Sequence, residues 1–535
     1  MKRRALIRKL GLVPLTGVFA QLLPSSVYAG WGTEKAIDKA DVLKKAAKGK
    51  SIYEKLGVRP VINGRGTITV IGGCRVLPEV EQAMQEATLD YVEFDELMDG
   101  VGQRLGELTG TEFGVVSTGA TGAMMIGTTG IVTGGDPDKL WQLPNLDGMK
   151  DEVIIPRYSW TAYESAVRGV GVRMITVDNK EELKAALGPR TAMVLVLAGS
   201  KSMNGPLSVK EIASVTKPLG VPIMVDAAAE GLPVPNPHIS QGADLVAYSG
   251  GKYLGGPQCA GLLIGRKDLI KAAWVTSAPH HGFARGYKVG REEIMGMLTA
   301  VEMWMKRDHT KEREIWTSTL EYIADKLNKI PGLETSIRQP PPEQLSNPSP
   351  SLKVQWDMKK IPLTGYDVEQ ILWDGTPRVA VSGAGSFLPF PPNMEPNIRI
   401  NTSQLREGEE KIIADRVFEV LSNPPKIEKN LDAASFDLSG EWDVAIEFAA
   451  TASDQTFVIA QNGEDVKGTH YGSYASRALQ GSVHGDEVLI RSSHTLDGVR
   501  LNFTFKGKIQ NGQLMGGDVS FSEYGNGKWQ AKRRY

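Results

Sequence analysis

The sequence predicts an α/β domain built on a mostly parallel sheet, then a smaller α+β domain and a C-terminal domain of antiparallel strands. Between about residues 51 and 300, short apolar runs alternate with helix-like segments. This pattern is typical of buried parallel strands covered by helices on both faces. After about residue 435, short segments alternate polar and apolar residues between glycines, as antiparallel strands with one buried face do.

The composition is that of an ordinary globular protein, with 41% hydrophobic and 23% charged residues. Its 535 residues suffice for roughly two to four domains. The balance of 61 basic and 62 acidic side chains argues against a cationic nucleic-acid-binding surface. Cys74 and Cys259 are the only cysteines, too few for a zinc cluster or a disulfide framework. We therefore expect no metal site, and we expect both cysteines to be small buried residues.

Residues 1–29 are predicted to be a twin-arginine-like signal peptide. Five basic residues, among them Arg3 and Arg4, precede an uncharged stretch that ends in the small-residue pattern Val27-Tyr28-Ala29. Proline and glycine interrupt this stretch, so it spans a bilayer poorly. We expect a periplasmic or otherwise exported protein with no stable membrane span after signal removal; an uncleaved basic anchor is the alternative. Loss of the signal would change the formal charge from −1 to −6, which further disfavours nucleic acid as a partner.

The predicted large domain spans residues 30–310, including an N-terminal segment. A long helix is expected from Arg291 to about Arg307 at its end. Six apolar runs predict buried strands: Glu152–Ile155, Val172–Val177, Ala192–Ala198, Val221–Val225, Asp244–Ala247 and Gly261–Ile264.

The predicted small α+β domain covers residues 311–425. A proline-rich stretch at residues 339–342 marks a loop that leads into it. It ends in an apolar run at residues 398–401 and an amphipathic helix from Glu407 to about Leu421. A linker near residues 423–425 follows.

Residues 435–535 predict a lipocalin-like antiparallel barrel or sandwich of about eight strands. Trp442 and Trp529 are expected to plug it. His470, His484 and His494 are scattered through this region, so they are expected to be surface residues rather than ligands. No catalytic set is predicted here, and a ligand pocket, an oligomer contact and simple packing all remain open.

Two of the buried strands end in side chains suited to chemistry. The run Asp244–Ala247 leads through a Ser-Gly-Gly turn to Lys252, and the run Val221–Val225 ends at Asp226. A lysine desolvated at such a turn has a lowered pKa and forms Schiff bases with aldehydes. An aspartate at a neighbouring strand end can keep a pyridine nitrogen protonated. The pair therefore points to pyridoxal 5'-phosphate as the cofactor.

A turn of small residues at 115–122 precedes a helix-like segment. Its backbone N–H groups and the hydroxyl of Thr118 are suited to bind a phosphate at a helix N-terminus. Taken singly, each feature also fits a structural role: the turn as close packing, Asp226 as a strand-end cap and Lys252 as a surface lysine. Their order along the chain, phosphate turn, aspartate and lysine, is the order that a pyridoxal enzyme needs.

The segment around Lys252 resembles the cofactor-lysine segment of the bacterial selenocysteine synthase superfamily, within the aspartate-aminotransferase-like (fold type I) pyridoxal phosphate enzymes. The resemblance covers about residues 50–422 and implies that fold. Two segments look more like the branch that includes D-glucosaminate-6-phosphate ammonia lyase, which implies elimination at an amino acid. The matching segments are YSGGKYLGGPQ (248–258), GLLIGRKDLI (261–270), and, for the branch, SIYEKLGVRPVIN (51–63) and YKVGREEI (287–294).

Carried over by position, the resemblance implies Lys252 as the cofactor lysine and general base, and Asp226 as the partner of the ring nitrogen. It places four residues around the cofactor phosphate: Thr118, Gly119, Ala120 and Ser249. Many relatives also carry a histidine near residues 157–163 that covers the cofactor ring. This chain has none there, so we expect Trp160, or alternatively Tyr158, to stack on the ring. The substrate and the reaction can differ from those of the relatives for this reason.

The resemblance implies that an amino acid substrate displaces Lys252 to form an external aldimine, after which the freed lysine removes the α-proton. Loss of a β-substituent then gives ammonia and a keto acid, whereas reprotonation on the other face gives racemisation. Arg285 and Arg399 are candidates for binding a substrate carboxylate or phosphate, because guanidinium groups bind such anions bidentately. A surface or structural role is equally open for both.

Four functions compete at this point. A β-eliminating lyase acting on a small amino acid or amino sugar acid is favoured, and an amino acid racemase or aminotransferase would use the same residues. An L-seryl-tRNA(Sec) selenium transferase is disfavoured by the export signal and the acidic mature chain. A non-catalytic binding protein that uses its C-terminal barrel is least favoured, since Lys252, Asp226 and the phosphate turn are all present. The resemblance also implies a homodimer or a higher homo-oligomer.

Overall fold

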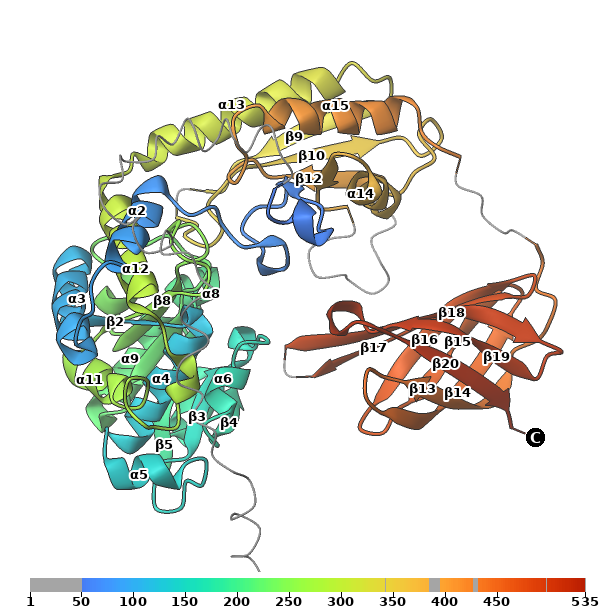
Figure 1. Ribbon diagram of the computed structural model, residues 1–535. Coiled ribbons are helices and arrows are strands. Elements are labelled where there is room, and N and C mark those ends of the chain that lie inside the picture. Colours follow the sequence, from blue (N-terminus) through green and yellow to red (C-terminus); the bar gives the residue numbers. More distant parts are fainter. Residues whose placement is uncertain (1–50, 342, 384–394, 427–431, 497, 535) are drawn as a thin grey trace, which may run out of the picture. The chain divides into compact units, whose positions relative to one another are not determined.

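The computed structural model of the protein describes residues 51–341, 343–383, 395–426, 432–496 and 498–534 (Figure 1). The predicted signal peptide lies outside the described residues. The chain divides into two compact units, and the larger, Val61–Tyr535, carries all the sheets described below. In the other unit, the described residues 51–60 contain the 3₁₀ helix η1 (Glu54–Leu56).

A seven-stranded sheet in the order β2-β8-β7-β6-β5-β3-β4 forms the centre of the α/β region. It is mostly parallel, as predicted; β8 alone among its strands runs antiparallel to its neighbours β2 and β7. The inner strands are almost wholly buried, because Val, Ile and Leu side chains on both faces are covered. The strands are β2 (Phe113–Ser117), β3 (Glu152–Pro156), β4 (Arg173–Val177), β5 (Thr191–Leu197), β6 (Ile223–Asp226), β7 (Leu245–Ser249) and β8 (Gly261–Gly265).

Helices cover this sheet and form one apolar core with it. Helix α4 (Gly119–Thr133) contacts β7 and β8 and is buried on nearly all sides, which agrees with its uniformly apolar sequence. The predicted long helix is α12 (Arg291–Lys306). The other helices are α2 (Pro78–Ala87), α3 (Phe94–Thr109), α5 (Pro137–Gln142), α6 (Ser165–Arg168), α7 (Lys180–Ala186), α8 (Ser200–Asn204), α9 (Val209–Thr216), α10 (Pro237–Ser240) and α11 (Lys267–Trp274), with the 3₁₀ turns η2 (Thr69–Ile71), η3 (Arg157–Ser159), η4 (Lys217–Leu219) and η5 (Arg285–Tyr287).

A second apolar core belongs to the smaller α+β region. Its antiparallel sheet has the order β12-β10-β9, and β1 pairs in parallel with β11. Helix α15 matches the predicted amphipathic helix. The elements are β1 (Val61–Asn63), α13 (His309–Leu327), β9 (Leu333–Arg338), β10 (Ser351–Trp356), α14 (Gly365–Asp374), β11 (Arg378–Ala380), β12 (Asn397–Ile400) and α15 (Glu409–Ser422).

The C-terminal region is a closed antiparallel barrel of eight strands with its own core, so the barrel alternative is confirmed over the sandwich (Figure 1). Trp442 and Trp529 are both buried in its interior. The guanidinium of Arg533 covers the ring of Trp442 at 4.8 Å. The strands are β13 (Gly440–Glu447), β14 (Ala452–Asn462), β15 (Asp465–Tyr471), β16 (Ser476–His484), β17 (Glu487–Leu496), β18 (Val499–Gln510), β19 (Leu514–Ser520) and β20 (Asn526–Arg533), with η6 (Ser522–Tyr524) before the last.

Two expectations about burial were wrong. His470 is fully buried inside the barrel rather than on the surface, because it shares the inward face of β15 with Val466 at the two-residue period of a strand. Cys259 is exposed and Cys74 is only partly buried, because both lie in turns beside the sheet rather than within it. Within the described residues, no helix combines the length and apolar character needed to cross a membrane.

Candidate active site

Three strand ends bring the predicted cofactor residues to one edge of the central sheet. Ser117, the last residue of β2, pairs with Gly261 at the start of β8, and Gly261 in turn pairs with Ser249 at the end of β7. Asp226 ends β6 and pairs with Ala247 of β7. Because β2, β7 and β6 all finish at this edge, their following turns lie side by side. Ligands of α/β proteins bind at such carboxyl edges.

The turn between β2 and α4 has the features of a phosphate site. The hydroxyls of Ser117 and Thr118 are buried and have no hydrogen-bond partner among the described residues. Both lie over the first turn of α4, since a Cβ added at Gly122 would come within 2.3 Å of Thr118 Oγ1 and 3.0 Å of Ser117 Oγ. Gly119 has a φ of +63°, a conformation that favours glycine. The Thr118 side chain does not cap α4, so the first N–H groups of the helix are available for an anion.

Close packing holds this turn against the lysine strand. A Cβ at Gly261 would lie 2.3 Å from the backbone carbon of Gly119, so only glycine permits β8 to approach the turn. Ala120 is buried in the first turn of the helix, and Ser249 lies across Gly261 from the turn. The structure thus brings the four predicted phosphate residues, Thr118, Gly119, Ala120 and Ser249, to the same place.

Lys252 and Asp226 form the electrostatic centre of the site. Asp226 is buried, and its carboxylate accepts the N–H of Ala228 at 3.0 Å. Burial raises the pKa of Asp226, and the nearby Lys252 ammonium opposes this. Burial lowers the pKa of Lys252, opposed by the negative charge of Asp226. Each side chain therefore favours the charged form of the other, against the larger effect of burial.

Contacts that the sequence analysis missed hold the Lys252 turn in place. The Cys74 thiol lies 3.5 Å from the carbonyl oxygen of Gly256, and burial raises its pKa to about 11, so it stays a neutral thiol. The guanidinium of Arg307 donates to the carbonyls of Tyr253 and Leu254 at 3.2 and 3.4 Å. A lone cysteine and an arginine at the end of a long helix gave no signal in the sequence for these roles.

Two cavities adjoin these residues. One of about 230 Å³ is lined by Lys252 together with Cys74, Arg307 and Trp316. The other, of about 380 Å³, is lined by Thr118 and also by Arg285, one of the two predicted substrate arginines. The Arg285 guanidinium donates to the carbonyls of Pro279 and His280 at 2.5 and 3.0 Å. These bonds hold it at the wall of the cavity.

Arg399 and Trp160 are placed differently from the other predicted residues. Arg399 lies exposed on β12 and lines neither cavity. The indole N–H of Trp160 donates to Thr176 Oγ1 of the edge strand β4 at 3.0 Å, and β5 and β3 separate β4 from the Asp226 strand. The alternative residue, Tyr158, donates its hydroxyl to the carbonyl of Leu207 at 2.7 Å. Substrate binding by Arg399 and ring stacking by Trp160 therefore stay predictions.

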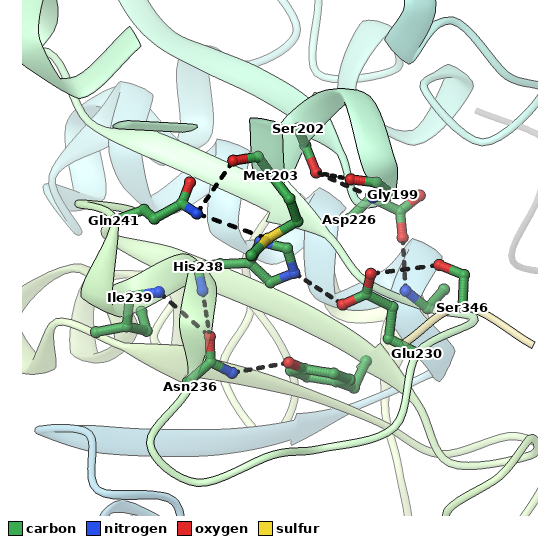
Figure 2. Close-up of polar contacts among 12 residues, drawn as sticks. Gly199, Ser202, Met203, Asp226, Glu230, Asn236, His238, Ile239, Gln241 and Ser346 are labelled. Atoms are coloured by element: carbon green, nitrogen blue, oxygen red, sulfur yellow. Dashed lines mark hydrogen bonds and ion pairs between the residues drawn. The ribbon is translucent and has the colours of Figure 1, made fainter. Parts of the chain in front are cut away.

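A buried polar network that was not predicted from the sequence lies close to Asp226 (Figure 2). His238 Nε2 contacts Glu230 Oε2 at 2.7 Å, and both side chains are almost completely buried. Asn236 donates to the hydroxyl of Tyr248 at 2.8 Å. The only hint in the sequence is that Glu230 follows Asp226 by four residues. No cluster of three or more metal-binding side chains occurs in the part of the chain that the structure describes.

The residues present fit pyridoxal phosphate. The unpartnered hydroxyls of Ser117 and Thr118 and the first N–H groups of α4 can bind its phosphate. The desolvated Lys252 and the buried Asp226 suit its aldehyde and its ring nitrogen. Fold and site together define a fold type I pyridoxal phosphate-dependent enzyme. Residues 82–282 match the family model described as Cys/Met metabolism PLP-dependent enzyme.

Comparison with known proteins specifies the family. D-glucosaminate-6-phosphate ammonia lyase of Salmonella typhimurium is 30% identical over 335 residues, covering 61% of this chain and 87% of the relative. A 5'-C-glycyluridine monooxygenase-decarboxylase of a Streptomyces species is 31% identical over 299 residues, covering 54% and 73%. A solved structure of D-glucosaminate-6-phosphate ammonia lyase matches with a TM-score of 0.60 and 28% identity, covering 70% of this chain and 99% of that one. The chain belongs to the family of pyridoxal phosphate-dependent enzymes that includes this ammonia lyase.

Proposed function

We propose that the protein is a lyase that eliminates a β-substituent from a small amino acid or amino sugar acid, releasing ammonia and a keto acid. The observation that carries this proposal is the pairing of a desolvated Lys252 with a buried Asp226 at neighbouring strand ends. The similarity to an ammonia lyase over 87% of that enzyme's length supports elimination over the other outcomes.

Pyridoxal phosphate, when bound, supplies an aldehyde for the substrate amino group and a ring that accepts an electron pair from the α-carbon. Thr118, Ser117 and the first N–H groups of α4 would hold its phosphate, with Ser249 on the neighbouring strand end. Asp226 would pair with a protonated ring nitrogen, because its buried carboxyl ends β6 at this edge of the sheet.

Lys252 moves the proton. Since burial lowers its pKa, a larger fraction of this lysine is the neutral amine at physiological pH than for a solvated lysine, and its Nζ accepts the α-proton. The turn that carries it is fixed by the Arg307 and Cys74 contacts, which limits the orientations of Nζ. Arg285, at the wall of the Thr118 cavity, binds an anionic group of the substrate.

A second outcome is favoured by one comparison. The Streptomyces relative is described as a monooxygenase-decarboxylase, so the same site can serve a reaction that releases carbon dioxide and consumes oxygen. Racemisation or amino transfer would also begin with proton removal by Lys252. Product analysis separates these outcomes: ammonia with a keto acid, carbon dioxide with oxygen uptake, an inverted amino acid, or an amino acid newly formed from a keto acid.

The test is the visible spectrum of the cofactor-supplemented protein, followed by product analysis with a panel of amino acids and amino sugar acids. We expect the native protein to show a visible band that borohydride abolishes by reducing the C=N bond, leaving the cofactor covalently attached, and we expect no covalently attached cofactor in Lys252→Ala. Lys217→Ala is the matched control, because Lys217 pairs with Asp244 at the opposite end of β7 and should keep the band. If the native protein shows no band, or if borohydride attaches the cofactor covalently to Lys252→Ala as well, the proposal fails.

We also propose export and self-association. Arg3 and Arg4 with the following apolar stretch support export. An Arg3→Lys/Arg4→Lys variant should stay in the cytoplasm, which cell fractionation measures.

Exposed apolar side chains support self-association, because Val70, Leu89 and Tyr91 are 79%, 78% and 94% exposed in a single chain. We expect light scattering to give the mass of a homodimer or more, and a monomer would contradict this.

A further inference from the structure

One arginine of the C-terminal barrel has hydrogen-bond donors that the described chain does not use. The guanidinium of Arg477 packs over the ring of Phe503 at 4.7 Å. Its one hydrogen bond within the described residues runs from Nη1 to the carbonyl oxygen of Ala475 at 3.3 Å, and its Nε is buried without a partner. No acidic side chain in the described part of the chain pairs with this guanidinium.

Arg477 faces the inside of the barrel, near one end. It is the second residue of β16 and lies on the same face as the buried Leu479, at the two-residue period of a strand. It also pairs across the strands with His470, whose ring is fully buried. Burial lowers the pKa of Arg477, and its positive charge contributes to the lowered pKa of His470. A cation held in such a position without a counter-ion is costly.

A second arginine of the barrel shows the arrangement of a fully satisfied guanidinium. Arg533 covers the ring of Trp442 at 4.8 Å, almost the distance between Arg477 and its own ring. All three guanidinium nitrogens of Arg533 donate to backbone carbonyls. The carbonyls are those of Gly512, Ser439 and Asp437. Arg533 is therefore part of the fold, whereas Arg477 has most of its five N–H donors unused.

The polar groups around Arg477 are neutral and already bonded. A Cβ added at Gly472 would come within 2.2 Å of Arg477 Nη1 and 3.2 Å of Gln455 Oε1, so these two atoms lie close together. Gln455 Oε1 accepts from His470 Nε2, and His470 Nδ1 contacts the hydroxyl of Ser492 at 2.7 Å. None of these groups carries a negative charge, so a ligand that completes the cluster has to supply one.

Aromatic side chains surround this charge. Phe503 contacts Phe521, and Phe521 contacts Phe448, with ring centroids 5.4 and 5.0 Å apart. Phe448 and Phe503 are only partly buried. Tyr474, three residues before Arg477, is fully exposed in the turn between β15 and β16. The surface next to the guanidinium therefore suits an apolar or aromatic group.

We propose that this end of the barrel binds a small carboxylic acid with an aromatic body. The carboxylate accepts hydrogen bonds from Nη1 and Nη2 of Arg477, the bidentate geometry that a guanidinium offers. The body of the ligand packs against the exposed parts of Phe503 and Tyr474. This site is separate from the proposed lyase activity, because all of its residues belong to the barrel.

The experiment is fluorine NMR of the full-length holoenzyme with para-fluorobenzoate as the probe. Its neutral isostere para-fluorobenzamide has the same shape and no charge. We expect saturable binding of the benzoate and none of the benzamide. Arg477→Gln should weaken benzoate binding by at least about tenfold, because it removes a charge-assisted pair of hydrogen bonds. Equal binding of both probes, or no saturable binding of either, would overturn the proposal.

The matched control is Arg491→Gln. Arg491 is a half-buried arginine on the outward face of the neighbouring strand β17, and burial lowers its pKa as well. This variant should bind the benzoate as the native protein does. If it weakens binding as much as Arg477→Gln does, the probe responds to the net charge of the barrel, and the assigned site is wrong.

Two further measurements separate this site from other anion sites. Arg285→Gln should keep benzoate binding; if it loses binding and Arg477→Gln does not, the acid occupies the cavity beside Thr118 and the inference fails. Chloride and inorganic phosphate at the probe concentration should not displace the benzoate. Displacement by either would show a site for any anion, against the carboxylic acid that we propose.

A measurement on the native protein covers the case in which Arg477→Gln does not fold. Photolabelling with para-azidobenzoate, followed by proteolysis and mass spectrometry, locates the bound acid. We expect labels on peptides that contain Tyr474 or Phe503. Labels found only outside the barrel would overturn the proposal without any variant.

Discussion

The α/β region and the barrel each enclose a fully buried histidine, and the two differ in the partners they contact. His238 lies against the carboxylate of Glu230, whereas His470 contacts the hydroxyl of Ser492 at 2.7 Å and the amide oxygen of Gln455. Neither neutral partner stabilises a charged ring. Burial, with a smaller contribution from Arg477, lowers the pKa of His470 to about 3, so it is neutral at physiological pH.

The difference teaches that burial alone does not mark a functional histidine. Aromatic rings surround His470, with Phe457 at 4.9 Å and Phe505 at 5.6 Å between ring centroids. Its hydrogen bonds are satisfied, so it serves as a polar element of the barrel core. His238 instead sits one tight turn from Asp226. Charged partners close to a cofactor site, rather than burial, connect a buried group to chemistry.

The largest expected difference between the regions concerns Asp226. Asp226→Asn keeps the size of the side chain but removes its charge, and we expect kcat/KM to fall roughly 10²–10³-fold, as for loss of one preorganised electrostatic group. Thermal stability should change little, because burial already disfavours the ionised form. Steady-state kinetics and calorimetry on the same preparations measure both.

The matched control is Asp244→Asn. Asp244 is another buried carboxylate of this sheet, but it lies just before β7, at the end of that strand opposite to Ser249. It pairs with Lys217 and Arg266 at 2.8 and 3.2 Å. Its loss removes the carboxylate that faces Lys217 and leaves Arg266 paired with Asp268 alone. Stability should therefore fall by about 1–3 kcal/mol, while the pH dependence of catalysis stays unchanged. Equal kinetic losses in both variants would show that any buried charge in this sheet matters equally, against our assignment.

A smaller effect, confined to stability, is expected in the barrel. His470→Ala creates a cavity and leaves Ser492 and Gln455 without their partner, which should cost about 2–4 kcal/mol. Hydrogen exchange of β14, β15 and β17 in the full-length protein measures this locally. The cofactor band should be unaffected. A shifted band would connect the barrel core to the site and end the contrast drawn between the two histidines.

The position of the candidate cofactor residues at one edge of the sheet was predictable because it depends on local patterns. A buried strand that ends in a glycine turn and a lysine, and another that ends in an aspartate, mark Lys252 and Asp226 as candidates, and their order along the chain favours a cofactor role over a structural one. The Thr118 turn is likewise marked by small residues before a helix. The same holds for the mostly parallel sheet, marked by continuous apolar runs between helix-like segments, and for the barrel strands, marked by alternating polar and apolar residues.

The remaining features depend on contacts between distant segments. The Glu230–Ser346 contact and the bonds from Arg307 to the lysine turn join residues far apart in sequence, and no periodicity marks them. The burial of His470 follows from the sequence only if Val466 on the same strand is taken to face inward, because the two residues lie on one face. A strand shifted by one residue would turn His470 outward, so the prediction needed the register that the closed barrel provides.

The lowered pKa of His470 makes the barrel sensitive to acid. An unfolded histidine, with a pKa near 6.5, takes up a proton at higher pH than the folded one does. The stabilisation is therefore complete above about pH 6.5 and is lost progressively as the pH falls toward about 3. Between pH 6.5 and 5 the loss should reach about 2 kcal/mol. Hydrogen exchange of the barrel at both values measures it; His470→Gln should lack this dependence, and an equal slope in that variant would exclude His470 as the cause.

The smallest expected effect concerns Trp160, whose indole N–H forms a hydrogen bond with Thr176. Trp160→Phe removes the indole N–H that donates to Thr176 and should cost about 1 kcal/mol of stability. Thr176→Val removes the same hydrogen bond from the other side and leaves the indole in place. If the contact is structural, both variants lose similar stability and keep the native cofactor band. A band shifted in Trp160→Phe but not in Thr176→Val would show that the ring itself meets the cofactor, since only that variant changes the aromatic surface.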